Sequence, residues 1–250
     1  MSDDVRRELG EVLALLSHDL KNPLAAVLTN LGFVASALDD PSAVEDAKEA
    51  VVDARLACES MQRFVGNLEL LARDSVGRSS LPPYDTTPLD VHALVEDVVD
   101  RQREAAAGRR LLVTVKTREP RTYARADRDL SLRALENLVA NAVQCAPTGS
   151  EIELVVQARL GDAREAEVVV RDDGLIVPAD LRETVSTPIG QVLSKGRQDA
   201  RYSRGLGLYA AFVAARAAGG RVEIGEDEGR SALRLILPCH EDDDGRPSQV

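Results

Sequence analysis

An imidazole, a carboxylate and an amide lie close together near the start of the chain, in the run Ser17-His18-Asp19-Leu20-Lys21-Asn22-Pro23. A neutral imidazole nitrogen is a nucleophile. An adjacent carboxylate can accept the other ring N–H, which fixes the tautomer and leaves the nucleophilic nitrogen available. Asn22 comes four residues after His18 and so lies on the same side of a helix. These three groups could make, hold and break a phosphorus–nitrogen bond.

The apolar residues around His18 predict one long amphipathic helix. Leucine and valine recur at steps of three and four over residues 9–38, the period of a helix with a single apolar stripe. His18 lies between Leu16 and Leu20, about 200° away from the stripe at about 100° per residue. We therefore expect its ring to face solvent. Pro23 cannot donate a helical hydrogen bond, so we expect the helix to bend or loosen just beyond this turn.

A second stripe predicts a second helix. After the turn signal Asp39-Asp40-Pro41-Ser42, apolar residues alternate steps of three and four from Val44 to Leu68. A hairpin of two such helices cannot cover both stripes by itself, whereas two copies packed as a four-helix bundle can. We therefore expect a homodimer. The alternative is that the stripes pack against the rest of the same chain.

Beyond the second stripe the pattern changes. Glycine, serine and proline interrupt the periodicity between Arg73 and Pro88, which indicates a linker. Helices are then predicted at 91–107, 130–143 and 207–218, and strands at 111–117, 152–160, 167–171, 222–226 and 232–237. The predicted fold is α+β: an antiparallel helical hairpin at 1–73, a linker at 74–88, a two-layer α/β sandwich at 89–239, and an acidic flexible tail at 240–250.

The composition narrows the class of protein and of partner. With 44% hydrophobic and 29% charged residues among 250, the chain reads as globular. No apolar run approaches the roughly 20 residues that cross a bilayer, and no basic segment precedes an apolar one at the N-terminus. We therefore expect a cytoplasmic protein without a membrane partner. A net charge of −11 disfavours nucleic acid and favours a protein partner. Three widely spaced cysteines argue against a disulfide framework or a metal cluster.

The segment around His18 resembles the H-box of sensor histidine kinases, in which a histidine followed by an acid and, four residues on, by Asn or Thr is phosphorylated. The resemblance implies that His18 is the phosphoacceptor, that Asp19 activates it, and that Asn22 positions water for dephosphorylation of a partner. Outside such a context, a lone exposed histidine on a helix is usually only a solvated side chain.

Three separated pieces of the second domain resemble the ATP-binding boxes of the same kinases, which share a fold with the gyrase and MutL ATPases. The first, Glu136 to Ala142, puts Asn137 and Asn141 one turn apart on a helix, on the face opposite its apolar core. Mg²⁺ prefers oxygen ligands and keeps several waters, so the amide oxygen of Asn141 and the triphosphate oxygens of ATP would suffice to hold it. Asparagine pairs also occur on ordinary solvated helices. The core face of this helix comprises Leu132, Leu135, Val139 and Ala142.

The second piece, Asp172-Asp173-Gly174, follows a predicted strand. The resemblance assigns the contact with the exocyclic amine of adenine to Asp172, and Gly174 would admit the ring closely. A strand that ends in Asp-Asp-Gly is otherwise a common turn.

The third piece opens a helix and comprises Ser203, Arg204, Gly205, Leu206 and Gly207. Its glycines would let backbone N–H groups and the helix N-terminus meet phosphate oxygens. Basic residues just upstream would offset the triphosphate charge from a mobile lid. These are Lys195, Arg197 and Arg201.

The chain departs from the family pattern at four positions. Gln144 and Cys145 stand where a lysine and an aromatic residue usually follow the asparagines, Ile176 replaces a glycine of the adenine box, and Ser203 replaces the first glycine of the phosphate loop. Losing one aromatic contact and one charged hydrogen bond costs about 1–3 kcal/mol each. We therefore expect weakened ATP affinity.

The resemblance implies a two-component histidine kinase that moves the γ-phosphoryl group of Mg-ATP to His18 and then to an aspartate on a response-regulator receiver domain. Its input would come from a separate upstream sensor or kinase protein. The main alternative is a histidine phosphotransferase or response-regulator phosphatase whose nucleotide-binding domain is non-functional. A dimeric interaction protein without phosphoryl chemistry is a third, weaker reading.

Overall fold

The computed structural model describes residues 3–38, 40–75, 88–118, 122–160, 164–185, 187 and 206–239. Its N-terminal part is a hairpin of two long helices, α1 (Asp3–Ala37) and α2 (Val44–Ser75), joined by the 3₁₀ helix η1 (Pro41–Ala43). The Asp40 carboxylate accepts hydrogen bonds from the hydroxyl and the backbone N–H of Ser42, at 2.7 and 2.9 Å. These two hydrogen bonds lower the pKa of Asp40. The turn is therefore short and capped.

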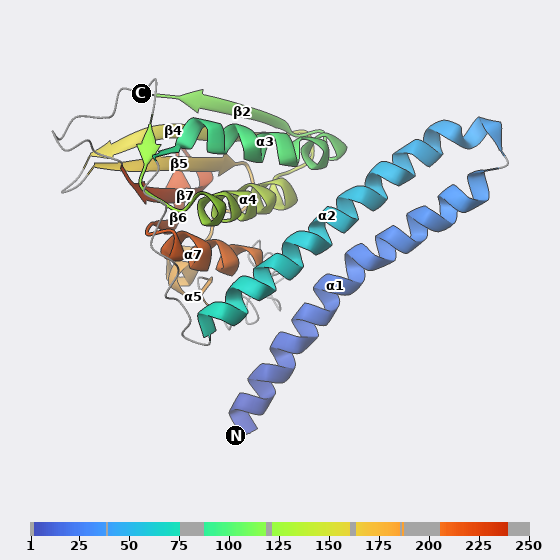
Figure 1. Ribbon diagram of the computed structural model, residues 1–250, viewed down its shortest axis with the longest axis horizontal. Helices are drawn as coiled ribbons and strands as arrows, with labels where there is room; N and C mark the ends of the chain where they lie inside the picture. The colour runs from blue at the N-terminus through green and yellow to red at the C-terminus, as the bar shows by residue number, and fades with distance from the viewer. Residues whose placement is uncertain are drawn as a thin grey trace.

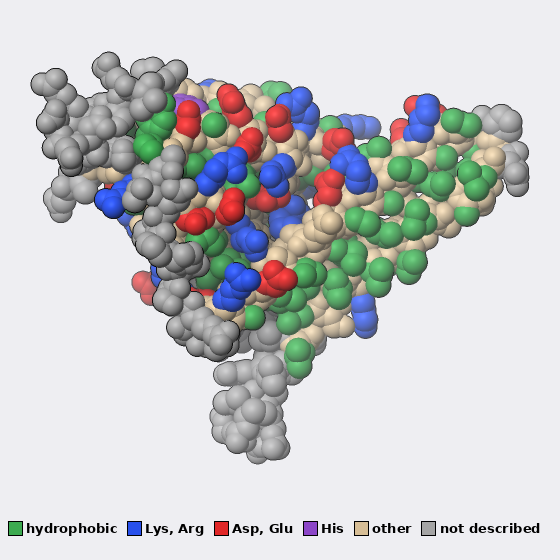
Figure 2. All heavy atoms as spheres, viewed as in Figure 1, with side chains coloured by type: hydrophobic (Ala, Val, Ile, Leu, Met, Phe, Trp, Pro, Cys, Tyr) green, Lys and Arg blue, Asp and Glu red, His purple; other side chains and the backbone are tan. Residues whose placement is uncertain are grey.

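The hairpin leaves part of its apolar stripe uncovered. Val27 and Val34 are half-buried against α2, but Leu24 and Leu31 remain exposed, and Leu28 beside them is 64% exposed. Figure 2 shows hydrophobic side chains gathered along the hairpin. No described residue covers these leucines, so both alternatives, packing within the chain and packing in a dimer, stay predictions.

Helix α1 runs without interruption across Pro23, so the expected loosening does not break the helix. Helix α2 continues beyond the predicted end of the hairpin at residue 73, as far as Ser75. The greater part of the predicted linker and the predicted tail, residues 76–87 and 240–250, lie outside the described residues. None of the described helices is both long and apolar enough to cross a membrane.

The second domain is a five-stranded sheet with helices on one face. In the order β2-β4-β5-β7-β6, β2 pairs with β4 in parallel and the remaining neighbours are antiparallel. Helices α3, α4 and α7 cover one face of this sheet (Figure 1). The strands are β2 (Leu112–Thr117), β4 (Glu151–Leu160), β5 (Arg164–Asp172), β6 (Arg221–Asp227) and β7 (Arg230–Pro238). The helices are α3 (Val91–Gly108), α4 (Arg128–Cys145) and α7 (Gly207–Ala217).

Every helix and strand predicted for this domain is present, with ends shifted by a few residues. The sequence pattern missed the short elements: the two-stranded sheet of β1 (Leu89–Asp90) and β3 (Tyr123–Ala124), and the pair η2 (Ala179–Leu181) and α5 (Arg182–Val185). Elements this short carry too few residues to show a period.

Helices α3 and α4 begin at aspartates that cap them, and they bury the faces that their periodicity predicts. The Asp90 carboxylate accepts from the backbone N–H groups of His92 and Ala93 at the start of α3. The Asp127 carboxylate accepts from Leu130 at the start of α4. The predicted core face of α4 is buried, at Leu132, Leu135, Val139 and Ala142. The two-layer α/β sandwich is thus confirmed.

The other face of the sheet carries a network of charged side chains. Arg171 on β5 is only 3% exposed and donates to Glu153 on β4 at 2.6 Å and to Asp227 on β6 at 2.8 Å. Lys116 on β2 also pairs with Glu153. The hydrogen bonds from Lys116 and then Arg171 hold the pKa of Glu153 below its usual value. One buried guanidinium therefore links three strands.

We expect Arg171→Met to destabilise the fold by about 3 kcal/mol, because it leaves the buried Glu153 carboxylate and the half-buried Asp227 carboxylate without their shared cation. Chemical denaturation monitored by circular dichroism measures the difference. Arg221→Met is the matched control, because Arg221 pairs with Glu165 at the surface, where ion pairs contribute about 0–1 kcal/mol. Equal losses in the two variants would contradict the role given to Arg171.

Candidate active site

The predicted nucleotide residues converge where α4, the end of β5 and the start of α7 meet. Asn137 and Asn141 lie on α4, Asp172 is the last residue of β5, and Gly207 is the first of α7. Helices α4 and α7 pack side by side. A Cβ atom on Gly207 would lie 3.2 Å from Oδ1 of Asn137. The fold therefore brings the first and third boxes into contact, although 66 residues separate Asn141 from Gly207 in the sequence.

Asp172 is fully buried at the end of the central strand. Its Oδ1 accepts a hydrogen bond from the backbone N–H of Gly174 at 2.7 Å, which closes a tight turn after β5. A buried carboxylate at a strand end can accept an exocyclic amine. Asn141 is half-buried and offers an amide oxygen, which is the kind of donor that Mg²⁺ accepts. The chemistry of Asp172 and Asn141 thus fits a magnesium nucleotide.

Asn137 is in a different situation from Asn141. Its Oδ1 accepts from Nδ2 of Asn67 on α2 at 2.8 Å, and its Nδ2 donates to Oδ1 of Asn67 at 3.0 Å and to the backbone oxygen of Arg133 at 2.9 Å. The two asparagines are 3% and 5% exposed. The expectation that Asn137 lies on a face away from the interior is therefore wrong, because α2 packs over that side of α4.

Helix α2 joins the second domain through a face that differs from its apolar stripe. Leu70 is part of the hydrophobic core of that domain. Arg133 of α4 donates to the backbone oxygen of Gly66. Nη2 of Arg216 on α7 contacts both carboxylate oxygens of Asp74, at 3.1 and 3.0 Å. In Figure 1, α2 lies between α1 and the α/β domain.

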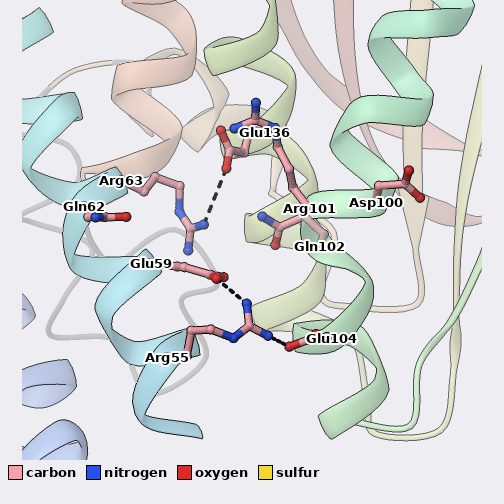
Figure 3. Close-up of a pocket in the computed structure, with 9 residues that line it drawn as sticks. All are labelled: Arg55, Glu59, Gln62, Arg63, Asp100, Arg101, Gln102, Glu104 and Glu136. Carbon is pink, nitrogen blue, oxygen red and sulfur yellow. Dashed lines mark hydrogen bonds and ion pairs between the residues drawn. The ribbon is translucent and has the colours of Figure 1, made fainter. Parts of the chain in front are cut away.

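A cleft of about 430 Å³ opens between α2, α3 and α4, farther along α2. Figure 3 shows Arg63 pointing toward Glu136, and Arg55 between Glu59 and Glu104. Arg63 is 3.9 Å from Glu136, and burial lowers the pKa of Arg63, although Glu136 and Glu59 oppose the shift. Both signs of charge line this cleft, whereas Asn141, Asp172 and Gly207 do not line it.

The predicted phosphoacceptor segment lies within α1. Asp19 is half-buried and Asn22 is exposed, on a continuous stretch of helix. The side chain of His18 lies outside the described residues, so the exposure of its ring and its pairing with Asp19 stay predictions. The roles of Asp19 and Asn22 stay predictions as well.

The phosphate-loop residues are only partly described. Leu206 is buried and Gly207 begins α7. The other loop residues, Ser203, Arg204 and Gly205, lie outside the described residues, as do the upstream Lys195, Arg197 and Arg201. Among the positions that depart from the family pattern, Gln144 is exposed, while Cys145 and Ile176 are half-buried. All three cysteines are free thiols.

Sequence reasoning missed Asn67, although a signal for it exists. Five polar or charged residues and one leucine recur at helical spacing on a second face of α2, with steps of four, four, four, three and four. This domain-facing row comprises Arg55, Glu59, Arg63, Asn67, Leu70 and Asp74. A row of this kind is also typical of a solvated helix face, so its partner becomes visible only in the structure.

Comparisons with known proteins cover both parts of the chain. Residues 8–77 match the family model "His Kinase A (phospho-acceptor) domain", and residues 126–241 match "Histidine kinase-, DNA gyrase B-, and HSP90-like ATPase". The chain is 28% identical over 234 residues to the sensor-like histidine kinase SenX3 of Mycolicibacterium smegmatis, covering 93% of this chain and 58% of that protein. It thus spans less than two thirds of the length of this relative.

Solved structures share the fold. The histidine kinase AdeS of Acinetobacter baumannii matches 90% of this chain and 98% of its own with a TM-score of 0.54 and 16% identity. Full-length ShkA in complex with AMPPNP matches 95% of this chain and 47% of its own with a TM-score of 0.58 and 20% identity. With a phospho-acceptor hairpin and a kinase-type ATPase domain in one polypeptide, the chain belongs to the two-component histidine kinases.

Proposed function

We propose that this chain autophosphorylates on His18 with Mg-ATP and passes the phosphoryl group to an aspartate on the receiver domain of a response regulator. The observation that carries the proposal is the union, in one chain, of the His18 helix with a domain that places a buried carboxylate, Asp172, at the end of its central strand. Because ATP is made and held in the cytoplasm, the proposal also places the chain there. A separate upstream protein as the source of input stays a prediction from the sequence.

Each predicted residue has a distinct task in this reaction. Asp172 accepts the exocyclic amine of adenine, and the start of α7 meets the phosphates with its backbone N–H groups. Asn141 contributes an amide oxygen to Mg²⁺, which when bound neutralises charge on the triphosphate. Catalysis of this kind consists mainly of positioning and charge neutralisation.

The phosphoryl group moves in two balanced steps. The free imidazole nitrogen of His18 attacks the γ-phosphorus. A nitrogen–phosphorus bond forms while the bond to the bridging oxygen breaks, and ADP leaves with the electron pair. Asp19 accepts the other ring N–H, which stabilises the positive charge that develops on the ring. A receiver aspartate then attacks the phosphorus, the nitrogen–phosphorus bond breaks, and the imidazole regains its electron pair.

We further propose that the chain works as a homodimer in which two hairpins form a four-helix bundle. The exposed leucines of α1 support this, since Leu28 alone is 64% exposed. Contiguous apolar surface of this kind marks an interface in a folded protein, and a second hairpin offers a complementary stripe.

We expect radiolabel from γ-labelled ATP and Mg²⁺ to appear on the wild-type chain and to be absent from His18→Ala, because this variant lacks the imidazole that we propose as the phosphoacceptor. Asn141→Ala should reduce the labelling rate at least about tenfold, through weakened metal binding. Labelling on denaturing gels measures both. His92→Ala is the matched control and should keep its label, because His92 lies at the start of α3, outside the proposed site.

Other outcomes of this assay discriminate between the functions. Label that persists in His18→Ala would contradict the assignment of the phosphoacceptor. Label acquired by His18 only from a phosphorylated receiver domain, and never from ATP, would favour the phosphotransferase alternative. Loss of phosphate from the receiver domain, with no label on the chain, would favour the phosphatase.

We expect the wild-type chain to sediment as a dimer at micromolar concentration, and the double variant Leu28→Glu/Leu31→Glu to sediment as a monomer, because two charges per subunit would be buried in the bundle. Sedimentation velocity measures the change. Leu112→Glu is the matched control, since Leu112 is 61% exposed on the edge strand β2. A wild-type chain that sediments as a monomer would contradict the proposed four-helix bundle.

A further inference from the structure

The domain-facing row of α2 contacts the second domain along most of its length. Arg55 pairs with Glu104 of α3, Arg63 lies 3.9 Å from Glu136 of α4, and Leu70 enters the core of the domain. Leu71 also packs against this core, whereas the contacts of Arg55 and Arg63 are polar. Polar contacts contribute little net free energy because water replaces them on separation. The joint between α2 and the domain is therefore of a kind that opens reversibly.

At the centre of this joint, Asn67 and Asn137 form a closed amide pair. Each side chain donates to and accepts from the other, at 2.8 and 3.0 Å, and the second N–H of Asn137 donates to the backbone oxygen of Arg133 at 2.9 Å. Both N–H groups of Asn137 and its oxygen are thus engaged, and the pair is buried. Asn137 has no donor left for a phosphate oxygen.

The same amide borders the proposed nucleotide site. Gly207, the first residue of α7, approaches so closely that a Cβ there would be 3.2 Å from Oδ1 of Asn137. Asn141 lies one turn farther along α4. Asn137 therefore has two neighbours: Asn67 of α2, and the start of α7, whose backbone we propose to bind phosphate.

We propose that Asn67 is an inhibitory residue: it occupies Asn137 while α2 is docked, so that docking of α2 and binding of a magnesium nucleoside triphosphate compete for one side-chain amide. The inference rests on the proposed function, because it takes this domain to bind ATP. In the docked state the start of α7 faces α2, and α1 lies on the far side of α2 (Figure 1). Nucleotide binding that recruits Asn137 breaks the amide pair and favours release of the domain from α2.

The coupling runs in both directions. If the nucleotide weakens docking by some factor, docking must weaken nucleotide binding by the same factor. A substitution on α2 that weakens docking therefore raises nucleotide affinity, although α2 belongs to the other domain. An ordinary structural contact would leave nucleotide affinity unchanged.

The test measures binding of a fluorescent, non-hydrolysable ATP analogue with Mg²⁺ to the full chain. We expect Asn67→Ala to bind it roughly tenfold more tightly than the wild type, because the variant loses both hydrogen bonds of the pair. Asp74→Ala, which removes the ion pair with Arg216 and does not touch Asn137, should bind it a few-fold more tightly. Glu69→Ala is the matched control, exposed on the same helix, and should bind as the wild type does.

Small-angle X-ray scattering supplies a second readout. The radius of gyration of the wild type should rise when the analogue and Mg²⁺ are added, and that of Asn67→Ala should be higher without them. Thermal melting checks that each variant is folded. If Asn67→Ala does not fold, Asp74→Ala takes its place in the test.

The outcomes separate the two proposals. Equal affinity of wild type, Asn67→Ala and Asp74→Ala would overturn the competition and leave the proposed function standing. Weaker binding to Asn67→Ala would overturn it as well, since Asn67 would then support the nucleotide site. If no folded variant binds the analogue, the proposed function fails and the competition fails with it.

Discussion

Helix α2 packs against two different surfaces, α1 on one side and the α/β domain on the other. The arrangement of the molecule depends on this double contact. One side carries the apolar stripe that faces α1. The other carries the domain-facing row, whose Leu70 lies in the core of the α/β domain. A helix has room for both because residues three and four apart share a face. Any motion of the domain relative to the hairpin must exchange contacts along this one helix.

The two joints of α2 differ in physical character. Helix α2 packs along α1, and the free energy of apolar contacts grows with the buried area and has no direction. Against the domain it uses oriented partners, above all Asn67 with Asn137, whose geometry admits one register. Buried amides are costly when left alone, so the pair either forms completely or exposes both groups to water or to another ligand. The contact between α2 and the α/β domain therefore forms in one geometry and can still open.

Most of the fold could be predicted from the sequence because its elements are long and strongly periodic. The core face of α4 and the strands of the sheet follow from local patterns alone. The burial of Asn137 could not be predicted in this way, since its partner Asn67 is 70 residues away in the sequence. The pattern of α4 only shows that position 137 is polar. Likewise, the charged network around Arg171 joins β4, β5 and β6, and no single strand reveals that its arginine is buried.

Gly207 lies where α7 comes close to α4. The positive-φ glycines of the described residues are Gly149, Gly219 and Gly229, so the backbone does not explain the glycine at 207. A Cβ there would lie 3.2 Å from the oxygen of Asn137, which is a tight contact. A methyl group at this position would require the carboxamide of Asn137 to shift by a few tenths of an ångström, so Gly207 sets how closely the start of α7 approaches Asn137.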